Sequence, residues 1–162
     1  MRLVKNCKNA LFVFIAIVLS LNYTNVKKDG FQVECVSVEN DGYINIHIWD
    51  LTKGLNYKMD QARKDAIITI LYSGLEGKNG CTNQLPLLND SESQKLFKRI
   101  EKSFFSKKGK WAEFTRSADF DNISQQLRPD TKFKIFKITI SKKLLQNFLV
   151  EEKIISNLSK GF

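Results

Sequence analysis

Residues 31–51 constrain the fold more than any other part of this chain, because they carry the pattern of a β-hairpin. Phe31–Val38 favours a strand, and the segment Tyr43–Leu51 alternates in character along its length. Between them, Asn40-Asp41-Gly42 supplies residues that tolerate the positive φ angles of a tight turn. Ile44, Ile46 and Ile48 share one face of the return strand, and Tyr43, Asn45, His47 and Trp49 share the other.

A helix is predicted after the hairpin, from an N-cap at Asn56 to about Ser73, with Gly74 ending it. Its apolar residues recur at helical spacing, at Met59, Ala62, Ala66, Ile67, Ile70 and Leu71. Asp60, Arg63 and Lys64 lie off this stripe. The small Ala62 and Ala66 predict a close approach between this helix and a sheet.

A loop without periodicity follows over Gly74–Asn89, and loops of this length are often functional. Ser91-Glu92-Ser93-Gln94 then fits a capping box that opens a helix over 91–106. The remaining predictions are a short strand at Trp111–Arg116, a loop over 117–131 with a turn at Pro129-Asp130, a strand at Phe133–Ser141, and a last helix capped by Ser141 and led by Leu144, Leu145, Phe148 and Leu149.

These segments predict one α+β domain over residues 25–162. The order is β-β-α-α-β-β-α, which favours a small antiparallel sheet of about four strands with helices packed on one face. A chain of this length after its first segment suits one compact domain rather than two.

The first segment has the pattern of an export signal, assigned to residues 1–24. Arg2, Lys5 and Lys8 precede the apolar run Ala10–Leu21, which is shorter than the about 20 residues that a membrane span needs. Cleavage is expected between residues 20 and 24, and an uncleaved signal anchor is the alternative. The protein is therefore expected in the periplasm or outside the cell.

Two of the three cysteines, Cys35 and Cys81, lie beyond this signal. An even number of cysteines in an oxidising compartment predicts a disulfide, and two free thiols are the alternative. In the second case a Cys81–His47 pair could act as a nucleophile, although nothing in the sequence brings the two together. His47 is the only histidine, and its expected role is structural.

A basic surface is predicted on the second helix and the turn that follows it. It consists of Lys95, Lys98, Arg99, Lys102, Lys107, Lys108 and Lys110. The first four recur at three- and four-residue spacing opposite the apolar Leu96, Phe97, Ile100 and Phe104, with Trp111 available to stack or to lie at a membrane interface. One interpretation is an anion-binding patch, and the other is the solvated face of an amphipathic helix.

No catalytic, cofactor or metal site is predicted. The carboxylates Asp50, Asp60, Asp65, Asp119 and Asp121 are scattered along the sequence. Asp119-Phe120-Asp121-Asn122 lacks the glycine and the distal glutamate of a calcium loop. Enzymatic activity is therefore left open but is not favoured, and no cofactor is expected.

Three short patterns resemble those of a known group of proteins. Ala62-Arg63-Lys64-Asp65-Ala66 follows a strand that ends in Ile48-Trp49-Asp50, and the later segments are Gly80–Leu87 and Ser159–Phe162. Together they resemble an uncharacterised family of small exported α+β proteins of Bacteroidetes-type bacteria. The architecture is also similar to periplasmic accessory domains of outer-membrane secretion machines. Neither resemblance implies catalytic residues.

The expected function is that of a non-enzymatic accessory or interaction module at the cell envelope, with a protein partner there. The alternatives are a basic surface module that binds anionic lipid or envelope polymer, and an enzyme of unrecognised type. No nucleic-acid partner is expected, although the excess of six cations over anions beyond the signal permits contact with anionic surfaces. The sequence does not indicate an oligomeric state.

Overall fold

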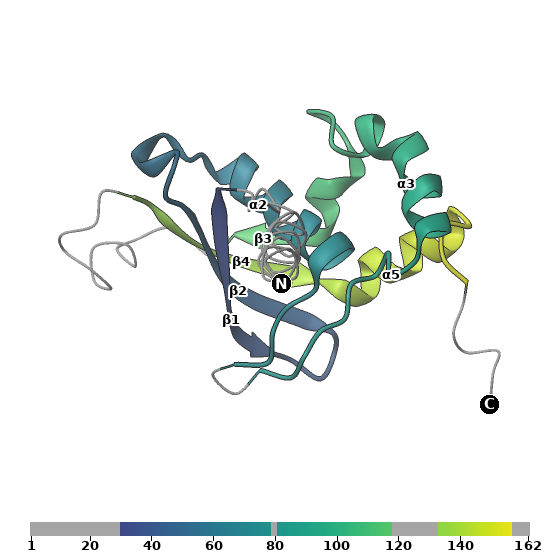
Figure 1. Cartoon of the computed structure of the whole chain (residues 1–162), viewed down its shortest axis with the longest axis horizontal. Coiled ribbons are helices and arrows are strands. Elements are labelled where there is room, and N and C mark those ends of the chain that lie inside the picture. The colour runs from purple at the N-terminus through teal and green to yellow at the C-terminus, as the bar shows by residue number, and fades with distance from the viewer. Residues whose placement is uncertain (1–29, 79–80, 118–132, 157–162) are drawn as a thin grey trace, which may run out of the picture.

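The computed structural model describes residues 30–78, 81–117 and 133–156 (Figure 1). Its elements in chain order are β1 (Phe31–Val38), β2 (Tyr43–Asp50), the 3-10 helix η1 (Gly54–Asn56), α2 (Met59–Ile68), the π-helix η2 (Thr69–Ser73), α3 (Ser91–Phe104), the 3-10 helix η3 (Lys110–Phe114), β3 (Thr115–Ser117), β4 (Ile135–Ser141) and α5 (Lys142–Glu151). The α+β class, the antiparallel four-stranded sheet and the predicted element order are confirmed.

The sheet has the strand order β1-β2-β4-β3, and every neighbouring pair is antiparallel. The predicted hairpin joins β1 to β2, and Gly42 in its turn has φ of +87°. β4 then pairs with the far edge of β2, with Ile44 opposite Ile140 and Ile46 opposite Ile138. A strand from the end of the chain therefore completes the sheet that the hairpin begins.

One face of the sheet forms the core. Ile44, Ile46 and Ile48 of β2 are fully buried, as are Ile138 and Ile140 of β4. The opposite face, which carries Tyr43, Asn45, His47 and Trp49, is half-buried. The alternation in the sequence therefore separates the two faces as predicted.

α2 packs on the core face of the sheet through Ala62 and Ala66, which have no exposed surface (Figure 1). Gly74 follows the helical segment, as predicted, with φ of +70°. The predicted N-cap at Asn56 is wrong. Asn56 instead ends η1, and Lys58 precedes α2 without a capping hydrogen bond from its side chain.

A second group of aromatic side chains packs between α3, η3 and α5. Phe104 lies at its centre, with ring centroids 5.2 Å from Phe97, 6.0 Å from Phe114 and 5.4 Å from Phe148. This contact joins the amphipathic face predicted for α3 to that of α5. The aromatic group therefore holds the two C-terminal helices to the rest of the core.

Two predictions in this half need correction. The N-cap of α3 is Asp90 rather than Ser91, because the Asp90 carboxylate accepts a hydrogen bond from Ser93 N at 2.8 Å. Residues 110–114 form a 3-10 helix rather than a strand, and only 115–117 are extended. Trp111 and Phe114 are three residues apart, so the helical turn buries both. The predicted cap of α5 is confirmed, since Ser141 Oγ accepts from Leu144 N.

Several predictions lie outside the described residues. They are the signal at 1–24, the Pro129-Asp130 turn, the segment Asp119–Asn122 and the terminal Ser159–Phe162.

Candidate functional site

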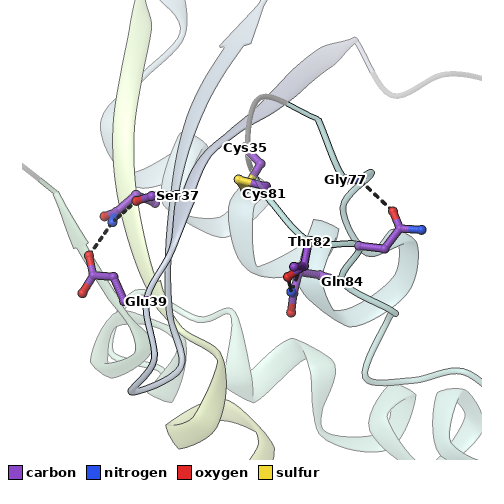
Figure 2. Close-up of a disulfide and its surroundings, with 9 residues drawn as sticks. Cys35, Ser37, Glu39, Gly77, Cys81, Thr82 and Gln84 are labelled. Carbon is purple, nitrogen blue, oxygen red and sulfur yellow. Dashed lines mark hydrogen bonds between the residues drawn. A yellow bond between two sulfur atoms is a disulfide. The ribbon is translucent and has the colours of Figure 1, made fainter.

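The predicted disulfide is present and links β1 to the long loop (Figure 2). The Cα atoms of Cys35 and Cys81 are 6.2 Å apart, and both side chains are buried. In the chain-entropy model, closing a loop of this size stabilises the fold by about 4 kcal/mol. Since Cys81 is oxidised, the hypothesis of a Cys81–His47 nucleophile is wrong.

Hydrogen bonds join the two strands of the loop on either side of Cys81. Leu75 and Gln84 exchange two backbone hydrogen bonds of 2.8 and 2.9 Å. Gly77 N donates a hydrogen bond to Asn83 Oδ1 at 2.7 Å (Figure 2). Gly74 is required beside this pair. A Cβ atom there would lie 2.1 Å from the carbonyl oxygen of Gln84.

The π-helix fixes the next part of the loop. Its turn is wider than an α-helical one, and the carbonyl groups of Ile70 and Leu71 accept hydrogen bonds from Leu87 N at 3.0 Å and Leu88 N at 2.9 Å. Leu88 is fully buried. The segment 85–90 is therefore held in its middle by these two bonds and at its end by the Asp90 cap of α3.

This segment and α5 face each other across an open groove of about 850 Å³, which the start of α3 and residues 153–156 also line. In Figure 1 the chain after residue 81 runs beside α5 to the start of α3. Apolar side chains make up half of the lining, namely Leu85, Pro86, Leu87, Leu96, Val150, Ile154 and Ile155. The polar lining consists of Asn89, Asp90, Glu92, Ser93, Lys142, Gln146, Lys153 and Ser156. Sequence reasoning identified the long loop but not the groove, because its walls come from distant segments.

All seven residues of the predicted basic patch are exposed. Lys98 pairs with Glu101, and Lys110 Nζ lies 3.3 Å from Glu113 Oε1. Within the described part of the chain, the other five have no carboxylate at ion-pair distance. The patch therefore lies where the sequence placed it, and its binding of anions stays a prediction.

Trp111 does not belong to that surface, contrary to the prediction. Its side chain is 3% exposed, and Nε1 donates a hydrogen bond to Ser106 O at 2.8 Å. Arg63 and Lys64 of α2 both lie 5.0 Å from the centre of its ring. These two cations, which the sequence placed off the apolar stripe, are half-buried and connect α2 to the segment after α3.

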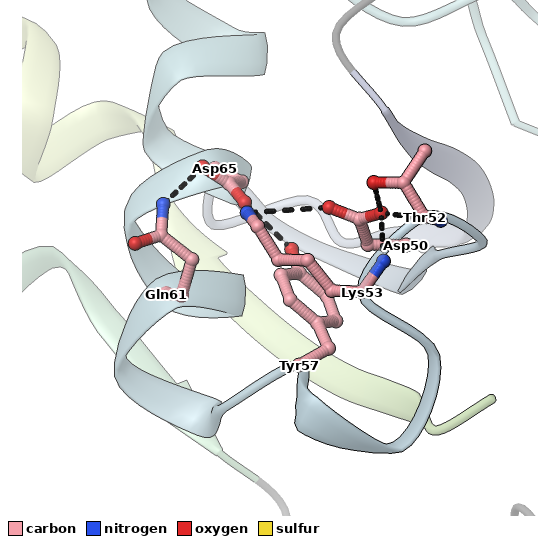
Figure 3. A network of polar contacts seen from close by, with 6 residues as sticks. All are labelled: Asp50, Thr52, Lys53, Tyr57, Gln61 and Asp65. Atoms are coloured by element: carbon pink, nitrogen blue, oxygen red, sulfur yellow. Dashed lines mark hydrogen bonds and ion pairs between the residues drawn. The ribbon is translucent and has the colours of Figure 1, made fainter.

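A buried polar network lies where β2 meets α2 (Figure 3). Asp50 accepts hydrogen bonds from Thr52 N, Thr52 Oγ1 and Lys53 N at 2.8, 2.6 and 3.0 Å, and Lys53 Nζ lies 3.2 Å from its other oxygen. Burial raises the pKa of Asp50, but the hydrogen bonds outweigh it and bring the pKa to about 2. Asp50 therefore stays ionised in the folded protein.

Asp65 of α2 belongs to the same network (Figure 3). It accepts hydrogen bonds from the Tyr57 hydroxyl at 2.8 Å and from Gln61 Nε2 at 2.7 Å. Burial raises the pKa of Asp65, and burial with the nearby carboxylate also raises the pKa of Tyr57. Asp50 and Asp65 are fifteen residues apart in the sequence, and the fold brings them close enough to interact electrostatically. Neither carboxylate lines any of the three cavities described for residues 30–78, 81–117 and 133–156.

His47 is half-buried on the open face of the sheet. Burial lowers its pKa, and the adjacent Glu34 acts in the opposite direction. Across the described ranges, no three potential ligands among histidine, cysteine and acidic residues gather in a way that could hold a metal ion. Nor does any helix within those ranges combine the length and apolar character that a membrane span needs.

Comparisons with protein-family models, with curated proteins and with solved structures found no match to this chain.

Proposed function

We propose that this protein is exported and acts as a non-enzymatic interaction module at the cell envelope. The observation that carries the proposal is the Cys35–Cys81 disulfide, which holds the long loop against the sheet. Disulfides persist in oxidising compartments and are rare in the cytosol. The cationic start and the apolar run Ala10–Leu21 support the same compartment.

The use of the polar groups supports binding rather than catalysis. The buried carboxylates Asp50 and Asp65 have their hydrogen bonds filled by neighbouring side chains and backbone, and Cys81 has no free thiol. The open groove beside the disulfide-bonded loop offers a partner a preformed surface. A fixed surface lowers the entropy cost of association.

Mass spectrometry of the protein from separated cell fractions tests this function. We expect a mature chain that begins between residues 21 and 25 in the periplasm or medium. A digest made without reducing agent should contain the Cys35 peptide and the Cys81 peptide linked by their disulfide. Cross-linking in intact cells should attach this chain to an envelope protein. An intact Met1 chain in the cytosol with all three cysteines alkylatable would contradict the proposal.

A second candidate function, binding to an anionic envelope surface, is favoured by the five cations of the basic patch that form no ion pair with a described carboxylate. The triple variant Lys95→Glu, Arg99→Glu and Lys102→Glu changes three of them without touching the apolar face of α3. The matched control is Lys58→Glu, Lys134→Glu and Lys143→Glu, which makes the same charge change at exposed positions elsewhere.

Sedimentation with vesicles of phosphatidylglycerol and phosphatidylcholine separates these variants. The wild type and the control should bind at low salt and release as salt rises, because charges are screened beyond about 8 Å at physiological ionic strength. The patch variant should not sediment. Equal sedimentation of both triple variants would leave the patch as an ordinary solvated helix face.

A further inference from the structure

The groove between segment 85–90 and α5 presents apolar side chains to solvent in a fixed arrangement. Leu85 at its rim is 74% exposed, although its neighbour Gln84 is tied to Leu75 and the following Leu87 and Leu88 are tied to η2. An exposed leucine on a fixed backbone is typical of a contact surface rather than of a mobile loop. The groove therefore favours a ligand with apolar groups.

Lys142 adds a positive charge to one wall of the groove. It is half-buried, and its Nζ donates to Gln84 Oε1 at 3.0 Å and lies 3.4 Å from Leu85 O. Both acceptors are neutral, and no carboxylate in the described residues forms an ion pair with it. Burial lowers the pKa of Lys142. An anionic group beside Lys142 would supply the counter-charge that this cation lacks. Asp90 and Glu92, which also line the groove, disfavour an anion near the start of α3, so the acidic group of the ligand belongs at Lys142.

Two amide side chains indicate what else the ligand carries. Gln146, one turn after Lys142, and Asn89 on the facing segment both line the groove. Neither forms a side-chain hydrogen bond to another described residue. A peptide backbone offers both donors and acceptors to such amides, whereas a hydrocarbon chain would leave them unpaired.

The wall formed by α5 also has a suitable length. Lys142, Gln146 and Val150 lie at four-residue spacing on one face of the helix, so the wall extends about 12 Å. An extended chain covers this distance with about four residues. The groove therefore matches a short extended segment of another protein.

We propose that this groove binds an extended peptide segment of a protein partner, with apolar side chains in the groove and an acidic residue against Lys142. The proposal rests on the proposed function in that it names the partner surface of the interaction module. It differs from the basic patch, none of whose residues lines the groove and which would attract anionic surfaces of any kind.

Selection from a random heptapeptide library displayed on phage tests the proposal with the protein purified from its own cells. We expect enriched peptides that combine apolar residues with Asp or Glu. Lys142→Glu should reduce their binding at least tenfold. Lys143→Glu is the matched control, because it makes the same charge change one residue away on an exposed position outside the groove, and it should not alter binding.

A second pair of variants keeps the test informative if Lys142→Glu impairs folding. Gln146→Trp fills the groove from α5, and Asn147→Trp places the same side chain on the exposed side of that helix. Peptide binding should be lost only in Gln146→Trp. Enrichment of peptides without acidic residues, or equal binding by both members of either pair, would overturn the proposal.

Sodium decanoate serves as the competing ligand. If decanoate binds the groove more tightly than every selected peptide and displaces all of them, the groove binds a fatty acid and the peptide proposal is wrong. The binding assay does not depend on where the protein resides. Its failure is therefore distinct from a cytosolic location, which would contradict the proposed function alone.

Discussion

The guanidinium of Arg63 lies 5.0 Å from the centre of the Trp111 ring, so a cation from the middle of α2 packs on an aromatic side chain beyond the end of α3. The same guanidinium donates hydrogen bonds to Thr115 Oγ1 at 2.8 Å, Ala112 O at 2.9 Å and Thr115 O at 3.0 Å. One side chain therefore positions both η3 and the start of β3.

Replacing this side chain should destabilise the fold. Arg63→Ala removes three charge-assisted hydrogen bonds and the contact with Trp111, and we expect a loss of about 2–4 kcal/mol in the free energy of unfolding. Urea denaturation followed by circular dichroism measures it. Arg99→Ala on the exposed face of α3 is the control and should stay within about 0.5 kcal/mol of the wild type. Equal effects at the two positions would show that Arg63 carries no structural role.

The disulfide should stabilise the fold mainly by lowering the conformational entropy of the unfolded chain. The double variant Cys35→Ala and Cys81→Ala is expected to lose about 4 kcal/mol of stability. A reducing agent should lower the stability of the wild type by a similar amount and leave the double variant unchanged. A wild type that is insensitive to reduction under denaturing titration would contradict this account.

Gly74 should not tolerate a side chain. Gly74→Ala introduces a Cβ atom at a φ of +70° and 2.1 Å from the Gln84 carbonyl oxygen, which belongs to a paired backbone. We expect a loss of about 2 kcal/mol or more, because the backbone itself has to move. Ser73→Ala, at the exposed neighbouring position, is the control and should be nearly neutral. Thermal denaturation that ranks the two variants equally would be inconsistent with the clash expected for a Cβ atom at this position.

The low pKa of Asp50 makes stability depend on pH in the acidic range. Since the folded pKa of about 2 lies below the ordinary value of 3.8, the stabilisation is complete above about pH 4 and is lost as the pH falls towards 2. Asp50→Asn should therefore have a lower Tm at neutral pH and a smaller further decrease between pH 5 and pH 2. The exposed Asp60→Asn should keep the wild-type profile. Parallel profiles for wild type and Asp50→Asn would show that this carboxylate is not stabilised by folding.

The sequence predicted those parts of the fold in which the deciding contacts are local. The hairpin follows from alternation over a few residues and from the turn at Gly42, and the disulfide follows from two cysteines beyond an export signal. The 3-10 helix at Lys110–Phe114 had a signal of its own, because Trp111 and Phe114 repeat at a spacing of three rather than two.

Other features depend on contacts between distant segments, which periodicity does not report. Arg63 and Lys64 look like solvated residues until η3 packs against them. The N-cap of α3 moved by one residue because Asp90 and Ser91 are both good capping residues. The groove needs the loop and α5 together, so no single stretch of sequence contains its pattern.

The strand order β1-β2-β4-β3 also limits the order in which the parts of the sheet can form as the chain folds. The residues between Cys35 and Cys81 include β2 and α2, so their covalent ring can close before β4 pairs with β2. Until β4 pairs, one edge of β2, the strand that carries Ile44, Ile46 and Ile48, has no hydrogen-bonded neighbour in the sheet. A partly folded chain therefore has an unpaired strand edge. Pairing of β4 with this edge competes with pairing to the same edge of another chain, which leads to aggregation.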